Sequence, residues 1–418
     1  MRQLASGRDV KGMGMKVKKT GDLKFIQEWN RFLILNVIRR EGPISRSEIA
    51  KLIDISPTTV TTAVSEMIRE GLVAEVGSGT SRGGRKPILL KFVPDSKFLI
   101  AVSIKNSSIS VSRMNLDAEI KRKESYPTGG RKGDDFIRFV ISCIDGFLSG
   151  EQNFDRCLGI SISCPGIVDP QKGSVRYNSK LDWQDVPLVR IIEDRFCMKT
   201  WLDNDANAMA LAEKNFGAYK NSDHLVHVTV GDGVGAGIVA NGELFCGHGG
   251  GAGEFGHICI VPDGAACECG NTGCLENYVA WPAVRSRIVG KLANGRPSLL
   301  RESGSGDGSQ IEIEDFLIAL EQEDVIATEV ALEISAYLAK GLVSLINLFN
   351  PQVVILGGDL FSGNSILLEQ VTRLTRQSIM NVFSEEIIIV GSSFGRDQHL
   401  VGAASVLLND QFRFSLLA

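Results

Sequence analysis

The sequence lacks both the long apolar runs of a membrane protein and the start of an exported one. No apolar run reaches the roughly 20 residues needed to span a bilayer, and the N-terminus shows no signal-peptide hydrophobic region. Hydrophobic residues make up 44% of the chain and charged residues 22%, as in ordinary globular domains. We therefore expect a cytoplasmic protein without a membrane partner. Its 418 residues are too many for one ordinary core, which predicts two or three domains.

Charge is distributed unevenly along the chain, although the formal net charge is only −4. Residues 1–93 contain 17 Lys and Arg against 9 Asp and Glu, whereas the remainder contains 28 basic and 40 acidic residues. A basic head on an acidic body is typical of a nucleic-acid-binding module joined to another domain. Scattered surface lysines give the same sum, so charge alone does not decide the function.

The nine cysteines fall into two groups. Six occur in apolar or mixed segments, where small buried thiols are expected: Cys143, Cys157, Cys164, Cys197, Cys246 and Cys259. The other three are close together in the sequence: Cys267, Cys269 and Cys274. In a cytoplasmic chain such a cluster indicates a metal ion rather than disulfides.

The N-terminal segment has the pattern of a helix-turn-helix. Residues 1–23 are polar, lysine-rich and without an apolar period, which predicts a mobile basic arm. A helix with Trp29, Phe32 and Leu33 on one face follows, and the chain breaks at Gly42-Pro43.

Two short helices come next, and each has its own start signal. Ser45 and Glu48 have the spacing of a capping box, and Ser56-Pro57 supplies a cap and a first-turn proline. This spacing predicts a helix-turn-helix whose second helix begins with exposed hydroxyl side chains that meet bases and phosphates. The candidate DNA-binding residues here are Ser47, Ser56, Thr58, Thr59, Thr61 and Thr62.

A basic hairpin follows the helix-turn-helix. Residues 72–76 and 88–92 read as strands, and the glycine-rich loop between them carries Arg82, Arg85 and Lys86. Such a loop alone is equally a solvated turn, but behind a helix-turn-helix it is typical of a wing that enters the minor groove. We therefore expect residues 24–93 to form a winged helix-turn-helix that binds double-stranded DNA.

From residue 97 the sequence alternates short β-rich runs with helices. A meander of three strands is predicted over residues 98–104, 108–114 and 119–125, and a similar beginning recurs over residues 225–230, 235–240 and 243–244. This weak duplication predicts an α/β domain over residues 97–418, with lobes at about 97–215 and 216–418 facing each other across a cleft.

Two motifs in the C-terminal part are highly specific in combination. Ala252-Gly253-Glu254-Phe255-Gly256-His257 is followed by a Cys-x-Cys-Gly-x-x-Gly-Cys-Leu-Glu run that starts at Cys267. Together they resemble the ROK family, which groups sugar-responsive repressors with sugar kinases, and the resemblance extends from about residue 98 to the C-terminus. The repressor branch also has a winged helix in front, and the overall match is most similar to repressors of xylose and N-acetylglucosamine utilisation. The resemblance implies a two-lobed actin-like, sugar-kinase-like (ribonuclease H-like) fold.

The resemblance also implies where a sugar and a metal ion bind. The residues that surround the sugar in the family match Gly166, Asn204, Asp205, Glu254, His257 and Glu276. By the same resemblance His257 joins Cys267, Cys269 and Cys274 as the fourth ligand of a structural Zn²⁺, although spacing alone leaves His248 as a rival. A closed shell of three thiolates and one imidazole leaves no position for an activated water.

The phosphate-binding turns of the ROK kinases are altered. Their first hairpin carries Asp-x-Gly-Gly-Thr, whereas the matching stretch here, Ser103–Ser108, has neither the acid nor the glycines. Asp232 replaces the usual Thr of the second turn. We therefore expect no kinase activity and no catalytic residues, with Asp205, the kinase base by resemblance, kept as an acceptor for a sugar hydroxyl.

These features predict a repressor of carbohydrate-utilisation genes, such as those of xylose metabolism, that sugar releases from its operator. Matching two half-sites of a palindromic operator requires a homodimer or homotetramer. The long helical run over residues 325–348 is a candidate interface, or else intradomain packing. Two alternatives stay open: an active ROK sugar kinase with a DNA-binding appendage, and a sugar-dependent activator or corepressor-type regulator.

Overall fold

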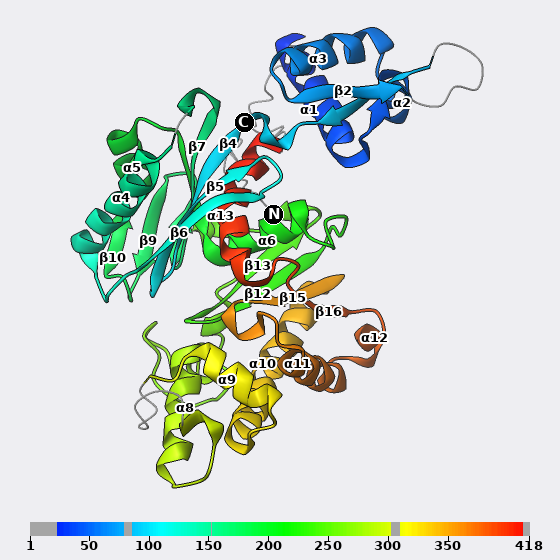
Figure 1. The fold of residues 1–418 in the computed structure, drawn as a ribbon. Coiled ribbons are helices and arrows are strands. Elements are labelled where there is room, and N and C mark those ends of the chain that lie inside the picture. The colour runs from blue at the N-terminus through cyan, green and yellow to red at the C-terminus, as the bar shows by residue number, and fades with distance from the viewer. Residues whose placement is uncertain (1–22, 79–85, 152, 302–309, 413–418) are drawn as a thin grey trace, which may run out of the picture. The chain divides into compact units, whose positions relative to one another are not determined.

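The computed structural model describes residues 23–78, 86–151, 153–301 and 310–412 of the chain (Figure 1). The described chain divides into two compact units, one ending at Val93 and joined by Phe412, the other spanning Pro94–Gln411. Residues 1–22 of the predicted arm over residues 1–23 lie outside the described residues. So do the wing residues Arg82 and Arg85.

The N-terminal unit is a small helical domain with a three-stranded sheet in the order β1-β3-β2. Its elements are α1 (Leu23–Glu41), β1 (Ile44–Ser45), α2 (Arg46–Leu52), α3 (Pro57–Arg69), β2 (Val73–Ser78) and β3 (Ile88–Phe92). β2 and β3 pair antiparallel, so the strands of the predicted hairpin are confirmed.

Caps determine where the two short helices begin. The Ser45 side chain accepts from the Glu48 amide at 3.3 Å while Glu48 accepts from the Ser45 amide at 2.9 Å, so the predicted capping box is confirmed. Ser56 caps α3 by accepting from the Thr59 amide at 3.1 Å, with Pro57 in the first turn. Each cap satisfies a helix amide that has no partner within its own helix.

The buried face of α1 differs from the expected one. Ile34 and Ile38 are fully buried, whereas Trp29, Phe32 and Leu33 are half-buried. The apolar residues of this helix surround more than half of its circumference, so the period alone did not identify the face that packs on α3.

The second unit has two lobes built on sheets of the same topology. The first sheet has the order β11-β7-β4-β5-β6 and the second the order β14-β13-β12-β15-β16. In each, an antiparallel meander continues through its first strand into two parallel strands. The expected internal duplication is therefore confirmed at the level of strand order.

The strands of the first sheet are β4 (Phe98–Ile104), β5 (Ser108–Asn115), β6 (Ile120–Pro127), β7 (Cys157–Cys164) and β11 (Thr200–Asn204). Those of the second are β12 (Leu225–Val230), β13 (Val234–Ala240), β14 (Glu243–Leu244), β15 (Val353–Gly357) and β16 (Ile388–Gly391). The first lobe adds α4 (Gly133–Ser149), α5 (Leu188–Phe196) and a small sheet of β8 (Ile167–Asp169), β9 (Ser174–Asn178) and β10 (Trp183–Val186).

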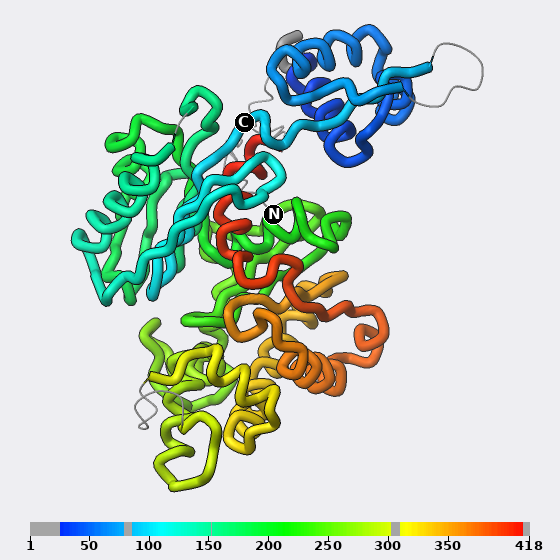
Figure 2. The backbone as a smooth tube through the Cα atoms, in the orientation of Figure 1, coloured from blue at the N-terminus to red at the C-terminus, as the bar shows by residue number. Residues whose placement is uncertain are grey.

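Two helices lie between the sheets. α6 (Asp205–Phe216) starts at the end of β11 and packs on β12 and β13. α13 (Gln398–Phe412) returns to the first lobe, where the Ser161 hydroxyl accepts from the Leu407 amide at 3.0 Å. Figure 2 follows the chain through the first lobe, into the second and back along the red C-terminal helix. These two helices thus connect the two lobes.

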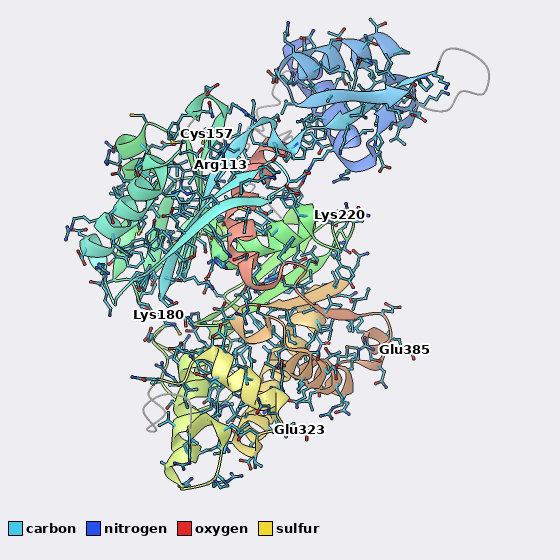
Figure 3. The ribbon with its side chains drawn as sticks, in the orientation of Figure 1. Arg113, Cys157, Lys180, Lys220, Glu323 and Glu385 are labelled. Carbon is cyan, nitrogen blue, oxygen red and sulfur yellow. The ribbon has the colours of Figure 1, made fainter. Side chains whose placement is uncertain are left out.

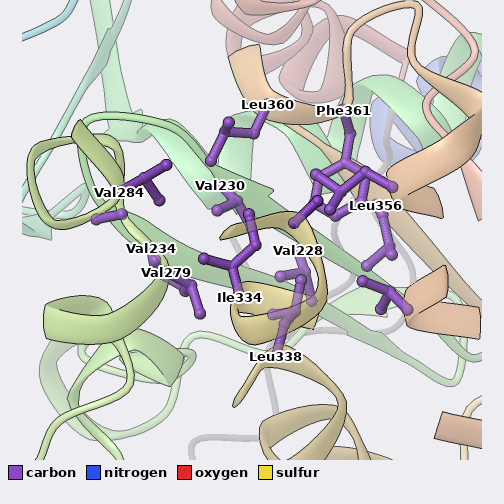
Figure 4. Close-up of a cluster of buried hydrophobic side chains, with 14 of the residues drawn as sticks. Val228, Val230, Val234, Val279, Val284, Ile334, Leu338, Leu356, Leu360 and Phe361 are labelled. Atoms are coloured by element: carbon purple, nitrogen blue, oxygen red, sulfur yellow. The ribbon is translucent and has the colours of Figure 1, made fainter. Parts of the chain in front are cut away.

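The second lobe contains an extensive apolar core. Its helices are α7 (Glu276–Val279), α8 (Trp281–Ala293), α9 (Ile313–Glu321), α10 (Val325–Phe349), α11 (Ser365–Ser378) and α12 (Asn381–Ser384). Val228 and Leu356 from the sheet meet Ile334 and Leu338 from α10 in a buried cluster (Figure 4).

α10 corrects one expectation from the sequence. By length and composition it is apolar enough to cross a membrane, although we expected no such run. Twelve of its 25 residues are buried, among them Ile334 and Leu342, and they pack in the core of the second lobe. This burial is what a core helix shows, and intradomain packing accounts for most of its apolar character.

Candidate functional site

The cleft is organised by the junction between β11 and α6. Asn204 ends the strand and caps the helix, and its side-chain oxygen accepts from the amides of Ala206 at 2.8 Å and Asn207 at 3.2 Å. Its amide nitrogen donates to the Gly166 carbonyl at 2.9 Å. One side chain therefore joins a strand end, a helix start and the loop that follows β7.

Gly166 is required by the geometry of that loop. It has a φ of +100°, and a Cβ there would overlap the Tyr177 carbonyl oxygen and lie 3.0 Å from the Cβ of Asn178. Asn178 in turn donates to the Pro165 carbonyl at 2.9 Å. Only glycine lets the loop lie this close to β9.

Asp205, the first residue of α6, presents its carboxylate to the cleft. Burial raises the pKa of Asp205, and the Lys105 ammonium opposes that shift. An ionised carboxylate at the start of a helix also interacts favourably with the helix dipole. The group is therefore suited to accept hydrogen bonds from hydroxyls.

The second lobe adds two carboxylates and an imidazole. Glu276 starts α7, and its carboxylate accepts from the Val234 amide at 2.8 Å. His257 Nε2 lies 3.9 Å from the Glu254 carboxylate. Partial removal from water raises the pKa of Glu254, and the nearby Asp205 and Glu276 carboxylates raise it further against the lowering effect of His257.

All six residues expected to surround a sugar line one cavity of about 520 Å³ between the lobes: Gly166, Asn204, Asp205, Glu254, His257 and Glu276. That volume lies in the range of small-molecule sites. Carboxylates and amides from both walls can donate to and accept from adjacent hydroxyls, which makes the cavity suitable for a polyol.

Two lysines in this cavity were not predicted as site residues. Lys105 Nζ lies 3.0 and 3.2 Å from the carboxylate oxygens of Asp359. Lys180 donates to the Asp232 carbonyl at 2.9 Å and lies 3.6 Å from the Glu276 carboxylate. Both lysines come from the first lobe and contact the second, and Figure 3 places Lys180 where the lobes approach each other.

Sequence position gave only a partial signal for these contacts. Lys105 is the first residue after β4, and Asp359 is the second residue after β15. Side chains just past the ends of strands often line ligand sites in α/β sheets. Their pairing across 254 residues has no local pattern, so only the fold brings it out.

The cysteine cluster forms a separate group next to the cleft. One ligand atom from each of His257, Cys267, Cys269 and Cys274 lies within 4.8 Å of the others. Cys267 Sγ is 3.6 Å from His257 Nδ1, and Cys269 Sγ is 3.6 Å from Cys274 Sγ. Thiolates around a tetrahedral ion with metal–sulfur bonds of about 2.3 Å lie about 3.8 Å apart, so the four residues fit such an ion.

Local backbone bonds shape the loop that carries these cysteines. The Cys267 amide donates to the Asn271 carbonyl at 2.8 Å, and Gly270, with a φ of +93°, makes the turn between them. A hydrogen bond from the Asn271 amide lowers the pKa of Cys269, whereas burial raises that of Cys274. Metal binding would displace the Cys274 proton.

The predicted DNA-binding residues lie at the start of α3 and beside it. Ser47, Ser56, Thr58, Thr61, Thr62 and Lys86 are exposed, and Thr59 is half-buried. The Thr61 and Thr62 hydroxyls donate to the carbonyls of Pro57 at 2.8 Å and Thr58 at 3.1 Å. Their oxygens can still accept hydrogen bonds from bases or from water.

Comparison with known families gives two matches. A model described as the ROK family matches residues 99–410. A model described as winged helix-turn-helix DNA-binding matches residues 30–74. Together they cover both units of the chain.

Individual relatives align over nearly the whole chain. A putative xylose repressor from Caldicellulosiruptor sp. is 32% identical over 94% of this chain and 99% of that protein. The DNA-binding transcriptional dual regulator NagC of Escherichia coli is 29% identical over 89% of this chain and 90% of that protein.

Solved structures of two kinds are similar. A ROK family transcriptional regulator, a homologue of the E. coli MLC protein, matches 93% of this chain and 98% of its own with a TM-score of 0.79 and 27% identity. A ROK family glucokinase from Streptomyces griseus, in complex with glucose and AMPPNP, matches 73% of this chain and 98% of its own with a TM-score of 0.68 and 28% identity. The second unit therefore has the sugar-kinase-like, actin-like fold, and the predicted fold class is confirmed.

Asp203 lies in β11 directly before Asn204, and its buried carboxyl group allows a test of the electrostatics of the site. Its carboxylate is buried, accepts from the Asn204 amide at 2.7 Å and from Asn207 at 3.1 Å, and burial raises its pKa from 3.8 to about 6. The folded protein thus holds this proton more tightly than the unfolded chain. The contribution of Asp203 to folding is full below its ordinary pKa and is lost as pH rises through about 6.

We expect Asp203→Asn to raise the free energy of unfolding at pH 7 by up to about 3 kcal/mol, because it removes a buried charge and keeps an acceptor oxygen. The gain should disappear below about pH 4, as urea unfolding across a pH series would show. Asp194→Asn, at an exposed position on α5, should give no such gain. A loss of stability of the same size at every pH would contradict the expectation.

Proposed function

The chain belongs to the ROK family, and we propose that it is a transcriptional repressor of carbohydrate-utilisation genes that sugar binding releases from its operator. The observation that carries this proposal is the combination of a winged helix-turn-helix domain with a cleft lined by hydroxyl-binding groups in one chain. Relatives that align over both parts are named as repressors of xylose or N-acetylglucosamine systems. A palindromic operator read by a dimer or tetramer is part of the proposal.

The DNA-binding part is supported by exposed groups at the start of α3. Thr58 and Thr62 are exposed there, where a recognition helix meets base edges. Ser47 and Ser56 flank them, and Lys86 is exposed at the base of the wing. We assign the threonines to base contacts and the serines and Lys86 to phosphate contacts; Arg82 and Arg85 are proposed for the minor groove from the sequence alone.

The sensing part is supported by groups on both walls of the cleft. Asn204 and Asp205 come from the first lobe, and Glu254, His257 and Glu276 come from the second. A polyol bound between them would make hydrogen bonds to both lobes at once, so its binding energy favours the closed arrangement over the open one. The proposed release from DNA uses this difference in affinity.

Phosphoryl transfer is not part of the proposed function. Lys105 and Asp359 form an ion pair next to the turn Gly231–Gly233, where the kinase resemblance places the nucleotide phosphates. Asp359 and Asp232 bring negative charge to this turn, which disfavours a nucleotide triphosphate. The similarity to the glucokinase therefore reflects the shared fold and sugar wall.

We assign a structural Zn²⁺ to His257, Cys267, Cys269 and Cys274. Four protein ligands complete a tetrahedral shell, so the ion would stabilise the loop and would not activate water. His257 presents Nδ1 to Cys267 and Nε2 to Glu254. Through its two ring nitrogens it would connect the metal loop to the sugar wall.

Operator binding by the full-length protein, with and without sugar, tests the main proposal. In an electrophoretic mobility assay, one sugar from a panel of pentoses and hexoses should release the operator fragment. Asp205→Asn should keep operator affinity and lose release, because an amide cannot replace an ionised acceptor. Asp134→Asn, in the exposed first turn of α4, should behave as wild type. Stronger operator binding with sugar would indicate a corepressor, and no effect of any sugar would contradict sugar sensing.

The phosphate contact assigned to Lys86 predicts a salt effect. Lys86→Ala should weaken binding to operator and to unrelated DNA alike and reduce the slope of log K against log salt by about 1. Titrations of labelled DNA at several salt concentrations would measure that slope. As a control, Lys220→Ala removes an exposed lysine from the second unit and should leave the salt slope unchanged. An unchanged slope for Lys86→Ala would rule out the phosphate contact of Lys86.

Metal analysis of the purified protein tests the zinc assignment. We expect about one Zn²⁺ per chain, and Cys274→Ser should lower that content and the thermal stability, since a structural site contributes to folding. Cys259→Ser changes an exposed cysteine beside the cluster and should retain the metal. Equal zinc content in both variants would contradict the assigned ligand set.

A further inference from the structure

The two altered phosphate turns are connected by one ion pair. Lys105 extends from the turn after β4, where its amide donates to the Ser108 carbonyl at 2.8 Å. The Asp359 carboxylate lies 3.3 Å from the position that a Cβ on Gly231 would take. Since Lys105 Nζ contacts both carboxylate oxygens of Asp359, its charge is neutralised between the two turns.

Negative charge dominates the cavity that this ion pair borders. Six carboxylates line it, from Asp205, Asp232, Glu254, Glu268, Glu276 and Asp359. Among the described residues, the Lys and Arg side chains that line it are Lys105 and Lys180. Both already have partners, because Lys180 contacts Glu276 and the Asp232 carbonyl. No lysine or arginine of the described lining is left to neutralise an incoming phosphate.

We propose that the effector of this cleft is an unphosphorylated, uncharged sugar and that Asp359 is the residue that excludes phosphorylated sugars. This inference rests on the proposed sugar-sensing function and narrows it to one chemical class. Neutral hydroxyls can donate to the crowded carboxylates, whereas a phosphate monoester offers acceptors and up to two further negative charges.

Lys105 is the group that a phosphate would need. Lys105 and Asp205 line the same cavity, and the Lys105 ammonium lowers the pKa of the Asp205 carboxyl, so a substituent on a sugar hydroxyl bound by Asp205 would share the cavity with this ammonium. An ammonium is a good phosphate partner only when its charge is free. The Asp359 carboxylate neutralises the Lys105 ammonium and brings a negative charge of its own. Selection against phosphorylated sugars is therefore assigned to Asp359.

Calorimetric titration of the full-length protein compares each neutral sugar with its own ester. The probes are D-xylose, D-glucose and N-acetyl-D-glucosamine, each beside its phosphate monoester. We expect one neutral sugar to bind at least tenfold more tightly than its ester. Tighter binding of the ester would overturn the inference alone, and failure of every sugar and ester to bind would overturn the proposed function as well.

Variants then test Asp359 directly. Asp359→Asn should raise affinity for the ester by about tenfold or more, and change affinity for the parent sugar by less than threefold, because it frees the Lys105 charge. Adding Lys105→Met to this variant should abolish the gain. Asp359 is half-exposed, with 42% of its side chain accessible, so the substitution is compatible with folding.

A second ion pair between the lobes provides the matched control. Lys123 contacts both carboxylate oxygens of Asp397, at 2.9 and 2.7 Å, and neither residue lines the cavity. Asp397→Asn should leave the ratio of sugar to ester affinity as in wild type. Two results would show that Asp359 does not select against phosphate. One is an equal change of this ratio in Asp359→Asn and Asp397→Asn, and the other is an equal change of sugar and ester affinity in Asp359→Asn.

Discussion

The side chain of Asn204 is the constraint on which the geometry of the cleft depends. It uses its oxygen on the first amides of α6 and its nitrogen on the Gly166 carbonyl. Those three bonds fix the direction in which α6 leaves the sheet. Asp205 is the next residue and lines the cleft, and its carboxylate accepts from the Ala206 amide at 2.9 Å.

Crowding of carboxylates follows from that arrangement. Asp205 meets Glu254 and Glu276 from the second lobe, and burial and mutual repulsion raise the pKa of Glu254. Like charges held together in a partly buried site are destabilising until donors reach them. Sugar hydroxyls are such donors, so the proposed sugar would offset part of this repulsion. The lysines at the margin, Lys105 and Lys180, relieve only part of it.

Local patterns predicted the parts of this protein that depend on near neighbours. Short motifs predicted the capping box of Ser45 and Glu48 and the cysteine cluster, whereas the six cavity residues came from the resemblance to the ROK family. Repeated strand spacing predicted the meanders and the duplication, but not the strand order of the two sheets. Ile34 and Ile38 were missed because α1 is apolar around much of its surface. Lys105 and Asp359 were missed because their meeting depends on how two lobes face each other, which no short motif encodes.

The duplicated topology explains why one ion pair has so much influence. The parallel strands of each lobe end at the cleft, so a side chain just past β4 and one just past β15 meet there. The ion pair of Lys105 with Asp359 gives the lobes a direct contact at this place. We propose that closure then depends on the sugar alone and needs no nucleotide. A protein of this fold can thereby respond to a sugar concentration without consuming a nucleotide, which is what a sensor requires.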